Sequence, residues 1–294
     1  MRLRVRLQTD PAWLDAQYNN RARIADSAAI FTRWQEASAL ARTELQGQLD
    51  VRYGDGPNET LDIFPAAAAT AGGVAKSPLL VFIHGGYWRS LDKSDHSFIA
   101  PAFVQAGATV VVPNYALCPA VGVDDIVLQV MRSIEWTWRH ADEFGGDASR
   151  IAVVGHSAGG HLAAMALSCQ WPRLAEDLPR QIVAGAMGIS GLYDLEPLRL
   201  CPYLNVDLKL TPPVVKRASP AFFPRPKAKF FAVAGMDESE EFLRHNRLIR
   251  DAWGPTTVPV CETLPGMHHL SILRSLADPG GRVHHLALRL LGLA

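Results

Sequence analysis

Short apolar runs alternate with helical periods along most of this chain, and that alternation restricts the fold more than any other feature. Leu79–Ile83 and Thr109–Pro113 are apolar almost throughout, as is typical of strands buried on both faces of a mostly parallel sheet. Between residues 125 and 142, apolar side chains recur at the spacing of one helix face: Val127, Val130, Met131 and Ile134. Strands joined by helices predict right-handed crossovers and a three-layer α/β domain.

The predicted strands fit a single sheet. They are Leu49–Tyr53, Glu59–Phe64, Leu79–His84, Ala108–Pro113, Arg150–Gly155, Val183–Ile189, Lys229–Gly235 and Val258–Leu264. We therefore expect one domain over residues 1–294, with a core at 46–294. Residues 1–45 are polar and aromatic and predict helices outside the sheet, as a cap segment. The Ala-rich stretch 65–78 predicts a surface loop.

Composition excludes several classes of protein. Lys and Arg number 29 against 29 Asp and Glu, so the net charge is 0, which argues against a nucleic-acid partner. Hydrophobic residues at 48% exclude a mainly disordered chain. The four cysteines are dispersed, so we expect reduced thiols.

Neither a signal peptide nor a membrane-spanning stretch is recognisable, which predicts a soluble cytoplasmic protein without a membrane partner. The sequence does not decide the oligomeric state, and a homodimer is one of the states that it leaves open.

A strand followed by Gly155-His156-Ser157-Ala158-Gly159 indicates a nucleophile elbow. In this motif the strand turns sharply into a helix and presents the serine hydroxyl at the carboxyl edge of the sheet. Small residues two before and two after the serine allow the strand and the helix to approach closely. Ser157 is therefore the predicted nucleophile.

The predicted oxyanion hole follows the third strand, at His84-Gly85-Gly86-Tyr87-Trp88. Glycines there leave backbone amides accessible, so Gly85 and Gly86, together with Ala158, are expected to hold the oxyanion, with Tyr87 as a further candidate donor. We expect His84 to order this loop by hydrogen bonding. Tyr87 and Trp88 suit either a substrate-binding wall or a cap on the apolar layer.

A serine nucleophile needs a base and a carboxylate that orients it, in the chain order serine, acid, histidine. Asp237 is the first carboxylate beyond the strand Lys229–Gly235 and is the predicted acid, with Glu238 as the competitor. Two adjacent histidines, His268 and His269, follow the last strand, and these residues alone leave the choice open. The other histidines match no strong metal-binding spacing, so no metal is expected.

Four segments now point to a family: residues 84–88, 114–119, 155–162 and 190–195. Together they resemble the kynurenine formamidases (arylformamidases) of the α/β-hydrolase fold, relatives of the hormone-sensitive-lipase type esterases, over about residues 50 to 275. The resemblance implies that the eight-stranded, mostly parallel sheet expected from the strand pattern has the α/β-hydrolase fold. It also assigns the base to His269, with His268 and Leu270 in place of the asparagine and the phenylalanine that flank the histidine in the family.

The resemblance further implies the reaction. It predicts a serine hydrolase of tryptophan degradation that cleaves N-formyl-L-kynurenine or a similar aryl formamide through Ser157, Asp237 and His269, without a cofactor. A small-acyl carboxylesterase is the alternative. A non-catalytic scaffold that binds a ligand is a more remote one, and nothing indicates the peptide groove of a peptidase.

Overall fold

The computed structural model describes residues 9–67 and 76–294. Residues 1–8, from which the absence of a signal peptide was inferred, lie outside the described residues. So does 68–75, which is most of the predicted Ala-rich loop.

All eight predicted strands are present, and they form one sheet in the order β1-β2-β4-β3-β5-β6-β7-β8. β1 and β2 pair antiparallel with their neighbours, and the remaining strands are parallel. The predicted mostly parallel α/β sheet is therefore confirmed. The strands are β1 Gln48–Arg52, β2 Thr60–Phe64, β3 Ser77–Ile83, β4 Thr109–Pro113, β5 Gly146–His156, β6 Val183–Ile189, β7 Lys229–Gly235 and β8 Val260–Leu264.

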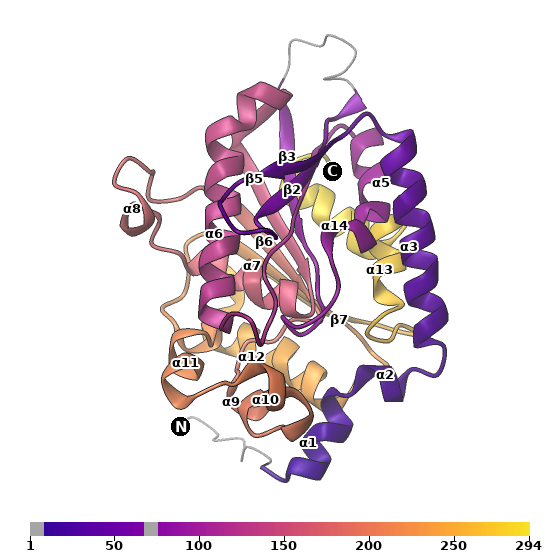
Figure 1. Ribbon diagram of the computed structural model, residues 1–294, viewed down its shortest axis with the longest axis vertical. Coiled ribbons are helices and arrows are strands. Elements are labelled where there is room, and N and C mark those ends of the chain that lie inside the picture. The colour runs from indigo at the N-terminus through magenta and orange to yellow at the C-terminus, as the bar shows by residue number, and fades with distance from the viewer. Residues whose placement is uncertain (1–8, 68–75) are drawn as a thin grey trace.

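Helices cover both faces of the sheet (Figure 1). The longer ones are α3 Ser27–Glu44, α6 Val123–His140, α7 Ala158–Ser168, α12 Glu240–Thr257 and α14 Arg282–Leu291. The shorter ones are α1 Pro11–Tyr18, α2 Asn20–Arg23, α5 Ala100–Gln105, α8 Trp171–Leu174, α9 Glu196–Arg199, α10 Pro202–Leu208, α11 Pro212–Arg217 and α13 Ile272–Ala277. Short 3₁₀ turns occupy Lys93–Asp95, Ser97–Ile99, Ala141–Phe144 and Pro220–Phe222.

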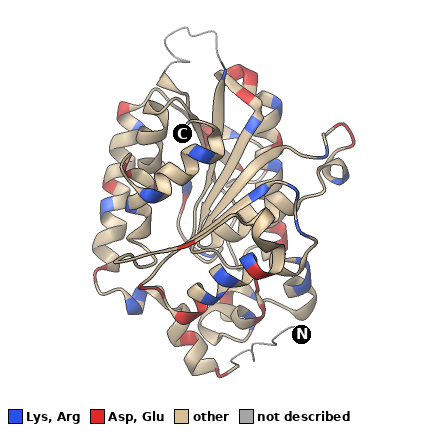
Figure 2. Cartoon of the chain, turned by 180° about the vertical axis from the view of Figure 1, so that it is seen from behind, with Lys and Arg blue, Asp and Glu red and all other residues tan. Residues whose placement is uncertain are grey.

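Successive side chains of β3 point to opposite faces of the sheet, and the core accordingly forms two apolar layers. Leu79, Val81 and Ile83 belong to one layer, and Leu80 and Phe82 belong to the other. This is the strand period of two applied to a sheet that is covered on both sides. The charged residues in Figure 2 accordingly lie mostly on the outer helices and loops.

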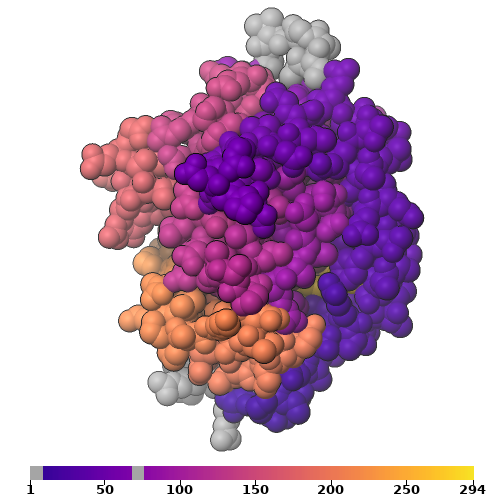
Figure 3. All heavy atoms as spheres, in the orientation of Figure 1, coloured from indigo at the N-terminus to yellow at the C-terminus, as the bar shows by residue number. Residues whose placement is uncertain are grey.

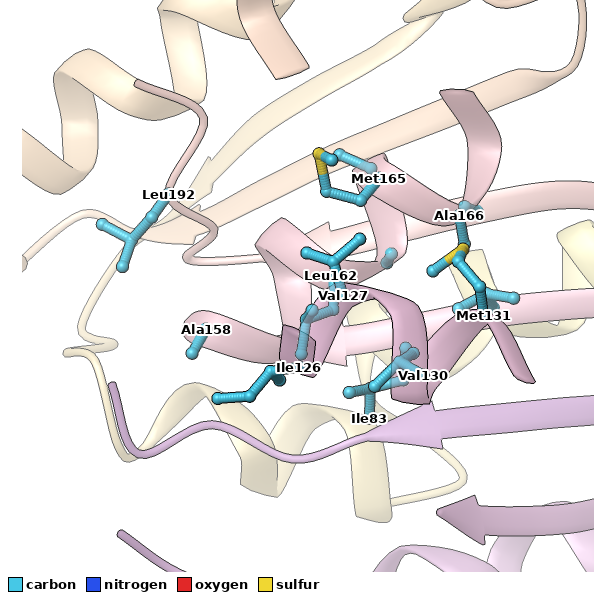
Figure 4. Close-up of a cluster of buried hydrophobic side chains, with 14 of the residues drawn as sticks. Ile83, Ile126, Val127, Val130, Met131, Ala158, Leu162, Met165, Ala166 and Leu192 are labelled. Atoms are coloured by element: carbon cyan, nitrogen blue, oxygen red, sulfur yellow. The ribbon is translucent and has the colours of Figure 1, made fainter. Parts of the chain in front are cut away.

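The layer that contains α6 and α7 holds in place the helix that begins directly after Ser157. The four α6 residues predicted to share a helix face are all buried. Figure 4 shows three of them, Val127, Val130 and Met131, beside Leu162, Met165 and Ala166 of α7. Burying each such aliphatic side chain contributes roughly 1.5–3 kcal/mol relative to exposure. This packing fixes the start of α7, where Ser157 lies.

The N-terminal helices pass from one side of the sheet to the other. Leu14 and Tyr18 of α1 join the α6–α7 layer, whereas Ile30 and Trp34 of α3 join the opposite layer. In Figures 1 and 3, α1 lies beside the α9–α11 segment at the lower end of the molecule, and α3 rises along its right-hand edge. Residues 19–26 therefore connect the two layers across an edge of the core.

Candidate active site

Ser157 occupies a strained turn between β5 and α7. Its φ of 57° and ψ of −117° lie where a non-glycine residue is seldom found. A Cβ on Gly155 would approach the carbonyl oxygen of Gly159 to 2.0 Å, and one on Gly159 would approach that of Ile83 to 2.0 Å. Only glycine fits both positions, so the predicted close approach of the strand and the helix is present. The motif thereby holds the serine at the start of α7.

Glu238 lies against His269. The Nδ1 atom of His269 is 2.7 Å from Oε2 of Glu238, and both residues are buried. The other carboxylate oxygen, Oε1, accepts hydrogen bonds from the Ser190 hydroxyl at 2.5 Å and from the Gly235 amide at 2.6 Å. The carboxylate is therefore held from three sides, and it fixes the orientation of the imidazole ring.

The prediction that Asp237 orients the histidine is wrong. The Asp237 side chain is exposed, and its amide donates to the carbonyl of Met267 at 3.0 Å. The turn after β7 brings the next residue, Glu238, back over the end of the strand, where its longer side chain reaches both Gly235 and His269. The competitor named from the sequence is the residue in contact.

His268, the other histidine of the pair, faces a different environment. Its Nδ1 accepts hydrogen bonds from the amides of Leu270 and Ser271, each at 3.2 Å, just before α13 begins. It therefore supports the local turn. Of the two histidines, His269 is the one that contacts a carboxylate and lines the same cavity as Ser157. No hydrogen bond joins His269 to Ser157 among the described residues, as is common in sites without substrate.

The loop after β3 brings its glycines close to Ser157. A Cβ on Gly85 would lie 3.0 Å from Cβ of Ser157, and Gly86 has a φ of 107° that favours glycine. Among the residues that the structure describes, no acceptor contacts the amides of Gly85, Gly86 and Ala158. These donors remain available to a bound oxyanion.

His84 orders this loop, as expected. Its Nδ1 donates to the Gly85 carbonyl at 2.8 Å, and its ring stacks on Tyr115 with 4.3 Å between centroids. The Tyr115 hydroxyl donates to the His84 carbonyl at 2.9 Å, and the Cys118 amide donates to the Trp88 carbonyl at 2.7 Å. Burial lowers the pKa of His84, so its neutral form is favoured. Segment 114–119 thus braces the loop.

A cavity of about 390 Å³ opens onto Ser157 and His269. Its walls come from the N-terminal helices, the loop after β3, the end of β5, α10 and the turn before α13. They are Asn20, Arg21, Phe31, Trp34, Gly86, Tyr87, Arg89, Ser90, Leu91, His156, Tyr203, Asp207 and Leu270.

The structure separates the two predicted substrate-binding aromatics. Tyr87 lines the cavity, and its hydroxyl donates to the Tyr18 carbonyl at 2.7 Å. Trp88 is wholly buried, packs edge-on against His161 at 5.0 Å and does not line the cavity, so its predicted substrate contact is wrong. Both residues have positive φ, 52° and 55°, and this backbone turn sends the second ring into the core.

His156, which precedes Ser157, contacts His269. Its Nε2 donates to the His269 carbonyl at 2.7 Å, and the two rings lie 4.7 Å apart. Burial holds the pKa of His156 well below its usual value, and the neighbouring His269 lowers it further. A neutral ring at this position avoids placing a second cation beside His269 in its protonated form.

Sequence reasoning gave no role to several residues of the site. Ser190 lies in one of the family-like segments, but its bond to the acid depends on the turn after β6. Asn20, Arg21 and Phe31 reach the cavity only through the path of the N-terminal helices. Trp34, in the segment predicted as a cap, also lines the cavity. Tyr18 is instead buried, and its hydroxyl donates to Glu241 at 2.6 Å.

Comparisons with known proteins identify the family. A family model described as BD-FAE matches residues 61–184. A kynurenine formamidase from Danio rerio is 32% identical over 259 residues, which cover 86% of this chain and 84% of that protein. The chain belongs to the kynurenine formamidase family. The expected family and α/β-hydrolase fold are thus confirmed, and the protein is a hydrolase.

Esterases are also among the relatives. Esterase LipQ of Mycobacterium tuberculosis is 30% identical over 75% of this chain and 56% of its own length. A solved structure from Silicibacter sp. TM1040, described provisionally as a thioesterase, superposes with a TM-score of 0.81. It is 29% identical and covers 93% of this chain and 98% of that one. Within residues 9–67 and 76–294, no helix is long and apolar enough to cross a membrane.

Proposed function

We propose that this protein hydrolyses an aryl formamide, N-formyl-L-kynurenine, to L-kynurenine and formate through Ser157, His269 and Glu238. The observation that carries the proposal is the 2.7 Å contact between Glu238 and His269 at a cavity that Ser157 also lines, in a chain of the kynurenine formamidase family. The aromatic rings of Phe31, Trp34 and Tyr87 on the cavity wall suit an aryl leaving group.

The first half of the reaction transfers the formyl group to the enzyme. Nε2 of His269 removes the hydroxyl proton of Ser157 as the oxygen attacks the formyl carbon. Glu238, on the other ring nitrogen, stabilises the resulting imidazolium and keeps the ring in the required tautomer. The imidazolium then gives its proton to the departing aniline nitrogen as the C–N bond breaks, which leaves a formyl ester on Ser157.

The second half releases formate. His269 removes a proton from a water molecule that attacks the ester, and then returns a proton to the Ser157 oxygen as the C–O bond breaks. In both halves, the amides of Gly85, Gly86 and Ala158 stabilise the oxyanion, and each donor contributes roughly 2.7–4 kcal/mol to lowering the barrier. Protein groups and water suffice for every step.

A small-acyl carboxylesterase is the second candidate, favoured by the similarity to Esterase LipQ. The same residues would perform the reaction, since only the leaving group changes from an amine to an alcohol. Removal of Ser157 abolishes either activity, so the substrate distinguishes the two candidates.

The N-terminal helices act, in this proposal, as a cap segment on a single catalytic domain. Asn20, Arg21, Phe31 and Trp34 of this segment line the cavity beside the nucleophile, which supports a role in substrate selection. We also propose a cytoplasmic enzyme, because its four cysteines are all free and a large core needs no disulfides.

The test is a comparison of kcat/KM for N-formyl-L-kynurenine and p-nitrophenyl acetate, with Ser157→Ala as the blank. A preference for the formamide that disappears in the variant supports the formamidase. Turnover of the ester alone supports the carboxylesterase. Activity on neither would favour the non-catalytic scaffold.

A further inference from the structure

Three fully charged side chains are among the described residues that line the cavity, and two of them are cations. They are Arg21 of α2, Arg89 of the loop after β3, and Asp207 of α10. The reaction described above uses none of them. The surrounding wall of Asn20, Phe31, Trp34, Tyr87 and Leu270 is uncharged.

Arg89 is held in one orientation with part of its guanidinium unused. Its Nη1 donates to the Tyr203 carbonyl at 2.8 Å and to Oδ2 of Asp207 at 2.7 Å, and its guanidinium lies 4.5 Å above the Tyr203 ring. The side chain is only 15% exposed. Among the described residues, no acceptor contacts Nε or Nη2. A partly buried, fixed guanidinium with free donors is well suited to bind a carboxylate.

Arg21 adds a second cation, on the part of the cavity wall that comes from the N-terminal helices. Its guanidinium lies 5.1 Å from the centre of the Phe31 ring, and it forms no ion pair with any described acidic residue. Asp207 is 39% exposed and uses only Oδ2 in its bond to Arg89, so among the described contacts Oδ1 stays available to a donor. The cavity therefore offers two positive groups and one negative group.

We propose that Arg89 and Arg21 bind the carboxylate of an α-amino acid carried by the leaving group, and that Asp207 accepts a hydrogen bond from its ammonium group. The inference rests on the proposed formamidase activity and names the feature by which that site selects its substrate. A zwitterionic amino acid matches the signs of all three side chains. A neutral aryl formamide would use only the aromatic walls.

The experiment compares three substrates that differ at this end only. They are N-formyl-L-kynurenine, its decarboxylated analogue N-formylkynuramine, and 2-formamidoacetophenone, which lacks both charged groups. We expect the wild type to show a kcat/KM at least tenfold higher for the first than for either of the others. A charge-assisted hydrogen bond worth about 1.5–3 kcal/mol corresponds to roughly a 10- to 100-fold change.

Two variants locate the effect. Arg89→Gln should raise KM for N-formyl-L-kynurenine by about tenfold or more, and Arg21→Gln by about threefold to tenfold, with kcat for that substrate nearly unchanged. KM for 2-formamidoacetophenone should change less than twofold in both. Arg23→Gln is the matched control, since Arg23 is exposed on the same short helix and does not line the cavity. Arg21 is also exposed, so its variant is expected to fold even if Arg89→Gln does not.

Equal turnover of the three formamides by the wild type would overturn this inference and leave the formamidase intact. So would an equal rise in KM for the charged and the neutral substrate. Turnover of p-nitrophenyl acetate with none of the three formamides would overturn both proposals, because no formamide would then be a substrate.

Discussion

His269 and Glu238 are joined by a 2.7 Å contact between Nδ1 and Oε2, while Asp237, one residue earlier, points to solvent. This arrangement assigns the orienting role to the second of two adjacent carboxylates. Because Asp237 and Glu238 are adjacent, substituting each in turn compares a carboxylate that contacts His269 with one that does not.

Glu238→Gln should lower kcat by about 10³- to 10⁴-fold, because an amide stabilises neither the required tautomer nor the imidazolium. Asp237→Asn should leave kcat within twofold, since its side chain is exposed. Steady-state kinetics on purified variants, with unfolding midpoints to show that each is folded, make the test. Loss of activity in Asp237→Asn with an active Glu238→Gln would contradict the assignment.

Ser190 positions the acid through its 2.5 Å bond to Oε1 of Glu238. Ser190→Ala should lower kcat by about tenfold, because a hydrogen bond to a charged group contributes roughly 1.5–3 kcal/mol, with KM unchanged. Ser239→Ala is the control. Its buried hydroxyl has no partner among the described residues, so removing it should leave kcat unchanged.

The fold was predictable because burial on both faces leaves a clear pattern in the sequence. All eight strands were predicted, and their predicted ends differ from the observed ends by four residues or fewer. The largest difference is at β5, which was predicted as Arg150–Gly155 and extends over Gly146–His156. The turn that holds Ser157 was also predictable, because a strand that turns sharply into a helix brings two backbone segments together. Gly155 and Gly159 are the residues that this close approach requires. In both cases a local pattern encodes the structure directly.

Other parts of the site depend on turns and packing that no local pattern encodes. Asp237 and Glu238 are adjacent, and only the path of the turn after β7 decides which side chain reaches His269. Consecutive left-handed residues send Tyr87 to the cavity and Trp88 to the core. The contribution of Arg21 requires the N-terminal helices to cross between two layers.

Trp88→Ala should mainly cost stability. The ring is fully buried against His161 away from the cavity, and removing a buried aromatic side chain costs about 3–5 kcal/mol. Trp138→Ala, at a half-buried position of α6, should cost clearly less. Urea unfolding followed by circular dichroism measures both. A Trp88→Ala protein of wild-type stability and raised KM would instead support a direct substrate contact.

Buried histidines should make the fold sensitive to acid, and His161 offers the clearest test. Its Nε2 donates to the Ala218 carbonyl at 2.7 Å, while its buried Nδ1 has no partner among the described residues. Burial lowers the pKa of His161 from 6.5 to about 4. Between these values the unfolded chain binds the proton and the folded chain does not. The free energy of unfolding therefore falls as the pH falls through this window, by at most about 1.4 kcal/mol per pH unit.

His161→Gln should reduce this acid sensitivity, because glutamine can keep a donor near Ala218 but does not titrate. Between pH 6.5 and pH 5, its free energy of unfolding should fall by up to about 2 kcal/mol less than that of the wild type, even if the variant is less stable at pH 7.5. Urea titrations at the three pH values give the comparison. His285→Gln, at an exposed position of α14, should keep the wild-type slope. An unchanged slope in His161→Gln would mean that this ring is protonated in the folded protein, in conflict with its lone buried Nδ1.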